Sequence, residues 1–119
     1  MSTTPAPSPH QPLPDPVIEL VARRFRVLGE PMRIRILERL RGGEQTVQEL
    51  TEALAASQQN VSKHLNILLD AGIVTRRKEG TSALYGIADP SVYQLCESVC
   101  GGLQRQFADL ANLVGGSLQ

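Results

Sequence analysis

The chain has 119 residues, of which 41% are hydrophobic and only 3% are aromatic, and its formal net charge is zero. This length fits one domain with an aliphatic core, and a core this small would gain stability by burying further apolar surface in a dimer. Zero net charge argues against a polycation that coats nucleic acid nonspecifically, but it allows a local basic surface.

Prolines dominate the N-terminus, where six of the eight lie within residues 1–16. We expect this segment to be a disordered tail with polyproline-II character, and we assign no chemistry to His10 within it. The sequence shows neither a signal peptide nor an apolar run as long as a membrane span. We therefore expect a cytoplasmic protein without a membrane partner, in which the two cysteines are reduced thiols or metal ligands rather than a structural disulfide.

Two amphipathic helices are predicted after the tail. Residues 17–28 carry apolar side chains on one broad face, and Gly29 interrupts the pattern. Pro31 opens the second helix, at a position where its missing N–H costs nothing, and the glycines at 42–43 end it.

The segment 46–72 predicts a helix, a tight turn and a second helix. Thr46, followed three residues later by Glu49, forms a capping box at the start of the first of these helices. After a short link at 55–56, Ser57 occupies the N-cap position of the next helix. This order is the helix-turn-helix arrangement.

The helix that follows Ser57 has two unlike faces. Val61, Leu65 and Leu68 recur at i, i+4 and i+7, which is the spacing of a core-facing stripe. The opposite face carries hydrogen-bonding side chains, namely Gln59, Ser62, Lys63 and Asn66. No acidic residue lies between positions 53 and 69, so phosphates would meet no repulsion. This face suits base edges in a major groove, although a merely solvated helix surface is an equally good interpretation of the segment alone.

A basic hairpin and a long helix complete the chain. Residues 73–78 predict a strand that becomes basic, 79–82 a turn and 83–87 a return strand, which together form a wing. Asp89 and Pro90 begin the last helix, whose apolar residues alternate at threes and fours: Val92, Leu95, Val99, Leu103, Phe107, Leu110 and Val114. This stripe is longer than one small core needs and predicts burial against a partner subunit. We place the folded domain at 17–114, with a flexible C-terminus at 115–119.

Taken together, these elements resemble the ArsR/SmtB repressors. The resemblance covers residues 17–113 and is carried by 31–37, 49–50, 57–65, 68–74 and the Arg-Lys-Glu-Gly sequence at 77–80. It implies a mainly α winged helix-turn-helix, with about five helices and a two-stranded wing, that dimerises through its first and last helices. It also implies a repressor that leaves double-stranded operator DNA when an effector binds.

The docking that this resemblance implies assigns DNA contacts to two elements. On the second helix of the motif the residues nearest base edges or phosphates are Gln59, Asn60, Ser62 and Lys63, with Gln58 and His64 as second choices. For His64, packing and hydrogen bonding inside the domain is an equally good alternative. In the wing, Arg76, Arg77 and Lys78 would reach phosphates or the minor groove.

The effector is the open question. Two ligand patterns typical of the family are missing, because residues 49–54 contain no Cys-x-Cys and the last helix contains no His. The cysteine that the persulfide-sensing branch places on its second helix is also missing. What remains is Cys96 and Cys100, whose i, i+4 spacing puts both thiols on one helix face.

Two thiolates suit a soft ion, best a trivalent arsenic or antimony species, or a methylated arsenical that needs only two sulfurs. Core packing of both cysteines is an equally good alternative, and a redox switch ranks lower because a disulfide within one helix would be strained. The remaining functional alternatives are a repressor with structural cysteines and a non-metal signal, or a winged-helix module that binds a protein. No nucleophile–base pair or phosphate loop is present, so we expect neither an enzyme nor a required cofactor.

Overall fold

The computed structural model describes residues 11–113, so the predicted tail over 1–10, including His10, and the C-terminus from 114 onward lie outside the described residues. Along the chain the elements are α1 (Asp15–Leu28), α2 (Pro31–Leu40), β1 (Gln45–Thr46), α3 (Val47–Leu54), α4 (Gln58–Asp70), β2 (Val74–Glu79), β3 (Ser82–Ile87) and α5 (Ser91–Leu113). Within this part of the chain, no helix combines the length and apolar character needed to cross a membrane.

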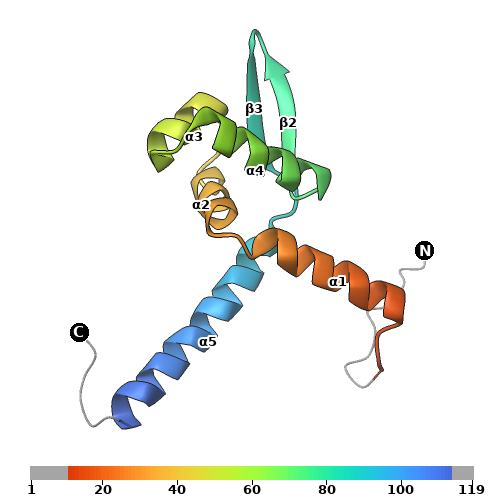
Figure 1. Cartoon of the computed structure of the whole chain (residues 1–119), viewed down its shortest axis with the longest axis vertical. Helices are drawn as coiled ribbons and strands as arrows, with labels where there is room; N and C mark the ends of the chain where they lie inside the picture. Colours follow the sequence, from red (N-terminus) through yellow and green to blue (C-terminus); the bar gives the residue numbers. More distant parts are fainter. Residues whose placement is uncertain (1–10, 114–119) are drawn as a thin grey trace.

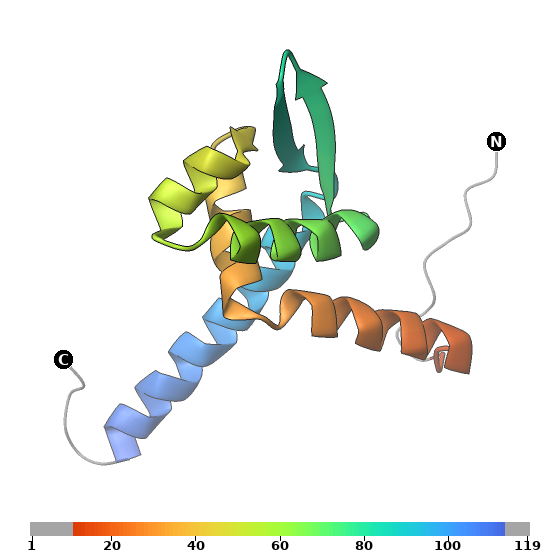
Figure 2. The ribbon, with the colours of Figure 1, turned by 45° about the horizontal axis from the view of Figure 1, so that its top comes forward.

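Two long helices leave a central body in different directions (Figure 1). The body consists of α2, α3 and α4 with the β2–β3 hairpin standing beside them, and α4 lies between the hairpin and α1 in both views (Figure 2). The core is aliphatic, as predicted, and its fully buried side chains are Ile36, Leu37, Leu50, Val61, Leu65, Leu68 and Ile73. The fold is therefore the predicted winged helix-turn-helix with five helices.

Helix starts follow their local signals. Helix α1 begins at Asp15 rather than at residue 17, because Pro16 falls in its first turn, where a missing N–H costs nothing. The helix thus reaches into the segment predicted as a tail. Helix α2 begins at Pro31 as predicted, and the Glu30 carboxylate accepts a hydrogen bond from the Met32 backbone N–H at 3.1 Å.

Side-chain caps mark the starts of α3 and α4, the two helices of the helix-turn-helix. The Thr46 hydroxyl accepts from the Glu49 N–H at 3.1 Å, and the Glu49 carboxylate accepts from the Thr46 N–H at 2.8 Å. Helix α3 ends at Leu54, and the next residue, Ala55, has a left-handed φ of 52° that turns the chain out of the helix. The Ser57 hydroxyl then accepts from the Asn60 N–H at 3.0 Å and starts α4. These contacts set the direction in which α4 leaves the motif.

The sheet has three strands rather than the predicted two, in the order β1-β3-β2. Strand β1 is only two residues long and pairs Gln45 with Tyr85 and Thr46 with Leu84. Because Thr46 also caps α3, this short pairing ties the root of the wing to the helix-turn-helix.

The first turns of α5 are fixed to α2. The Asp89 carboxylate accepts from the Ser91 N–H at 3.1 Å, as expected of the predicted cap, and α5 runs from Ser91, directly after Pro90. The Tyr93 hydroxyl donates to the Leu37 carbonyl at 2.6 Å, and the Arg41 guanidinium lies 4.2 Å from the centre of the Tyr93 ring. Farther along the helix the apolar stripe is exposed to solvent: Val99, Leu103, Phe107 and Leu110.

Candidate nucleic-acid interface and thiol pocket

The predicted division of α4 into two faces is confirmed. Val61, Leu65 and Leu68 are each 0% exposed, so the apolar stripe is wholly buried in the core. On the other side, the hydrogen-bonding side chains are exposed or half-buried and form what we call the polar face of α4: Gln59, Ser62, Lys63 and Asn66. Together with Ser57 and Asn60, two of these residues, Gln59 and Lys63, line a shallow hollow in the surface. A rigid helix therefore presents both donors and acceptors to an approaching ligand.

His64 is not part of that polar face. The side chain is only 6% exposed, and its Nδ1 accepts a hydrogen bond from Arg33 Nε at 3.1 Å. Burial, together with the neighbouring Arg33 charge, lowers the pKa of His64, so the ring is neutral at pH 7. The structure thus shows the packing and internal hydrogen bond that were the alternative for His64, and this side chain has little surface left to offer DNA. Its i, i+3 position after Val61 places it on the core side of the helix.

The basic run in the wing is divided between two faces. Successive side chains of a strand point to opposite sides, so Arg77 faces away from Arg76 and Lys78. Arg77 contacts two carboxylates, at 2.8 Å from Glu44 and 3.3 Å from Glu79. These hydrogen bonds raise the pKa of Arg77 and lower that of Glu44. Within residues 11–113, Arg76 and Lys78 have no ion pair and remain open to an anion.

The role of Glu44 was missed from the sequence. Its side chain packs over Gly86 in β3, where an added Cβ would lie 3.1 Å from the Glu44 Cγ atom. A glycine inside a predicted strand is a known sign of close approach by another group. Gly86 therefore carried the available signal, although it could not identify the approaching residue.

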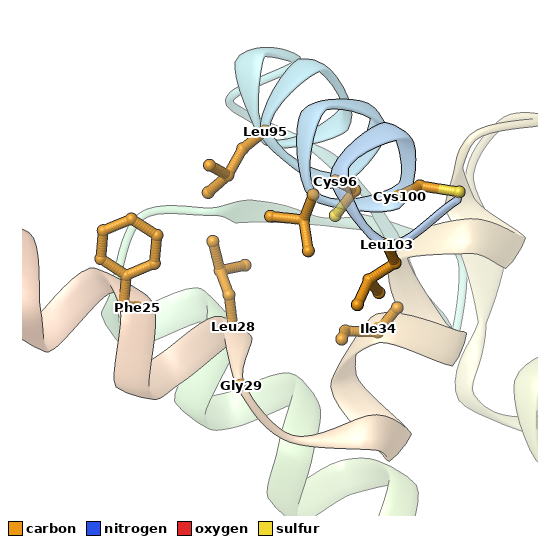
Figure 3. Close-up of a pocket in the computed structure, with 9 residues that line it drawn as sticks. Phe25, Leu28, Gly29, Ile34, Leu95, Cys96, Cys100 and Leu103 are labelled. Carbon is orange, nitrogen blue, oxygen red and sulfur yellow. The ribbon is translucent and has the colours of Figure 1, made fainter. Parts of the chain in front are cut away.

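Cys96 and Cys100 lie over the junction between α1 and α2, which we call the elbow (residues 28–31). A cavity of about 340 Å³, here named the thiol pocket, separates the elbow from α5 and is almost wholly apolar. It is lined by Phe25, Leu28, Gly29, Ile34, Leu95, Cys96, Val99, Cys100 and Leu103. In Figure 3 the Cys96 sulfur points into the pocket, whereas the Cys100 sulfur points away from it. The expected convergence of the two sulfurs is therefore absent in this conformation.

Both cysteines are free thiols, Cys96 half-buried and Cys100 exposed. Among the described residues, no three His, Cys, Asp or Glu side chains come together in a group that could hold a metal ion. The pocket thus supplies at most two sulfur ligands from this chain, surrounded by apolar side chains.

Comparison with known proteins extends the sequence resemblance. A helix-turn-helix domain model matches residues 28–77. The chain is 39% identical over 77 residues to a probable mercury resistance operon repressor of Streptomyces lividans, covering 65% of this chain and 62% of that protein. It is 39% identical over 87 residues to the transcriptional repressor SmtB of Mycobacterium tuberculosis, covering 73% of this chain and 61% of SmtB. The chain thus spans about three fifths of these two relatives.

Solved structures agree over most of the fold. The crystal structure of Rv0081 from M. tuberculosis superposes with a TM-score of 0.74 at 33% identity, covering 82% of this chain and 99% of that one. The homodimeric winged helix-turn-helix domain of Mb0332 from Mycobacterium bovis, described as a possible ArsR-family regulator, gives a TM-score of 0.67 at 28% identity, covering 85% of this chain and 91% of that one. The chain therefore belongs to the ArsR/SmtB family of winged helix-turn-helix transcriptional regulators, which are not enzymes.

Proposed function

We propose that this protein is a homodimeric, sequence-specific repressor that reads operator DNA with α4. The observation that carries the proposal is the arrangement of α4, whose apolar stripe is fully buried while its polar face is exposed. A helix held this firmly can place amide, hydroxyl and ammonium groups against base edges without further ordering. The repressor names of the two relatives support the same function.

A homodimer would supply a second copy of α4 for contact with DNA. The arms formed by α1 and α5 expose large apolar side chains, with Leu20 at 65% and Phe107 at 53%. Exposed apolar surface of this extent marks an interface, and the related Mb0332 domain is homodimeric. A two-fold pair would present two α4 helices to successive major grooves.

Within that pair we assign base and nearby phosphate contacts to the exposed start and outer side of α4: Gln58, Gln59, Asn60, Ser62 and Lys63. In the wing, Arg76 and Lys78 are free to meet phosphates, whereas Arg77 must first leave Glu44. Selection from random-sequence duplexes by the purified protein tests this assignment. Enrichment of a defined sequence that resists excess nonspecific competitor is expected, and no enrichment would favour the protein-interaction alternative.

For the effector, we propose a thiophilic ion bound by Cys96 and Cys100. The Cys96 sulfur already lines the pocket, and the exposed Cys100 side chain can bring its sulfur inward by rotating about χ1. With two thiolates and apolar walls, the pocket favours a species that needs only two sulfurs. A methylated trivalent arsenical fits best, because its methyl group can lie against Phe25 and Leu28. Arsenite and antimonite would need a third ligand from the partner chain or from water.

Release of the selected duplex tests the effector. Reduced protein bound to that duplex is titrated with methylarsenite, arsenite, antimonite and mercuric ion, the last because of the relative named for mercury resistance. We expect methylarsenite to release wild type but neither Cys96→Ser nor Cys100→Ser, with Ser98→Ala as the matched control on the same helix. If no ion releases DNA, or the serine variants respond like wild type, the cysteines are structural and the signal is a different one.

A further inference from the structure

One arginine side chain joins three helices of the domain. Arg33 belongs to α2, and its Nη1 donates to the Val27 carbonyl in the last turn of α1 at 2.9 Å. Its Nε donates to His64 Nδ1 in α4 at 3.1 Å, across 31 residues of sequence. The planar guanidinium fixes the angle between these two donors, so moving one partner disturbs the other.

The two acceptors that Arg33 binds are a backbone carbonyl at the end of α1 and a buried imidazole in α4. The Val27 carbonyl is among the last four of α1, which have no partner within their own helix. At the elbow an added Cβ on Gly29 would lie 3.0 Å from the Phe25 carbonyl oxygen in the last turn of α1, so the residue that follows this helix has little room for a side chain. At the other end, His64 is the one polar side chain among the buried residues of the described chain. The link thus runs from the last turn of α1 into the core side of α4.

We propose that Arg33 and His64 are positioning residues for DNA recognition, which hold α4 in register with the end of α1 only while the imidazole is neutral. The DNA part of this proposal rests on the proposed repressor function. An Nδ1 that accepts from Arg33 requires the ring proton to be on Nε2. Protonation of Nδ1 removes the acceptor and places a cation beside the guanidinium.

The charges around the ring favour the neutral state. Arg33 of α2 and Lys63 of α4 oppose an imidazolium, and among the described residues only Glu30 at the start of α2 favours it. Burial acts in the same direction as the two cations and is the largest cause of the lowered pKa of His64. The neutral ring therefore stabilises the fold above the unfolded pKa of about 6.5, and this contribution is lost as pH falls toward the lower folded pKa.

A double-mutant cycle on the full chain tests the link without DNA. Urea unfolding at one protein concentration compares wild type, Arg33→Met, His64→Leu and the double variant. At pH 7.5 we expect the two substitutions to be non-additive by about three- to thirtyfold in the unfolding constant. The coupling should shrink or reverse as pH is lowered to 5.0. Arg35→Met, an exposed neighbour on α2, is the matched control and should be additive with His64→Leu.

Rescue by an asparagine separates positioning from simple packing. His64→Asn places an amide oxygen near the position of Nδ1 but does not titrate. On the duplex selected by wild type, we expect His64→Leu to lose about tenfold in affinity at pH 7.5 and His64→Asn to stay within about twofold. Wild-type affinity should fall between pH 7 and 5, and His64→Asn should lose that dependence. Circular dichroism confirms that each variant is folded.

Three results would overturn the proposal: additive behaviour of Arg33→Met and His64→Leu, equal losses for the asparagine and leucine variants, or an unchanged pH dependence in His64→Asn. Failure of wild type to select any duplex would remove the repressor function instead. The unfolding cycle would still decide whether Arg33 and His64 are coupled, so the two failures are distinguishable.

Discussion

Arg77 in the wing and Glu44 in the loop after α2 form a bidentate ion pair. Arg77 Nε lies 3.0 Å from Glu44 Oε2, and Arg77 Nη2 lies 2.8 Å from Glu44 Oε1. The two residues are 33 positions apart in the sequence. The carboxylate therefore occupies the guanidinium fork that would have to be free to bind a phosphate in the proposed DNA complex.

Glu44→Gln should strengthen binding to DNA of any sequence and steepen the salt dependence by about one unit of slope, because it frees Arg77 for phosphate. In the same assay Arg77→Ala should reduce the slope by less than Arg76→Ala does. Filter binding across a salt series measures both effects. The control is Glu52→Gln on α3, which removes an exposed carboxylate that forms no ion pair within residues 11–113. Equal slopes for Glu44→Gln and wild type would contradict the competition.

Gln59→Ala should weaken binding to the selected duplex by about 1–3 kcal/mol and relax the preferred base at one position, since an amide can bond two atoms of one base. Binding to random DNA should change little. Competition assays with single-base variants of the duplex measure both quantities. Gln94→Ala, an exposed glutamine at the start of α5, is the control. An unchanged base preference in Gln59→Ala would show that Gln59 does not contact a base.

Phe107→Glu should convert the dimer to monomer and abolish tight operator binding. The ring is 53% exposed, and a carboxylate could not be buried against a partner at low cost. Sedimentation equilibrium measures the assembly state at several protein concentrations. Gln104→Glu adds the same charge to the same helix and should remain dimeric; dissociation of both variants alike would point to net charge rather than to the apolar stripe.

Thr46→Ala should lower the free energy of unfolding by about 1 kcal/mol, because it removes the side-chain half of the capping box. For a domain of this size such a loss lowers Tm by about 4–8 °C. Thermal unfolding followed by circular dichroism, at a fixed protein concentration, measures the shift. Thr81→Ala in the exposed turn of the wing is the control. A similar change in Tm in both variants would show that the capping box does not stabilise the domain.

The helix-turn-helix was predictable because its signals are local. The capping box at Thr46 and the i, i+4, i+7 stripe from Val61 each lie within one helix, and periodicity with capping chemistry specifies both. The polar face of α4 followed directly from that stripe.

Features that depend on distant partners were not predictable in this way. The i, i+3 spacing from Val61 brings His64 to the core side of α4, but the sequence did not reveal that Arg33 of another helix binds its ring. The sequence presents Arg76, Arg77 and Lys78 as one basic patch, but Arg77 is paired with Glu44, which lies 33 residues away in the sequence. Strand β1 is too short for any period to reveal. The two thiols share a helix face, yet the Cys100 sulfur points away from the pocket, which the i, i+4 spacing alone does not specify.

The most direct test of the account is the composition and symmetry of the complex with the selected duplex. Sedimentation of the complex together with footprinting gives the number of chains per duplex and the positions protected. We predict two chains on an inverted repeat whose half-sites lie on one face of the DNA duplex, about one turn of the duplex apart. A single chain on an asymmetric site, or protection that does not depend on sequence, would contradict it.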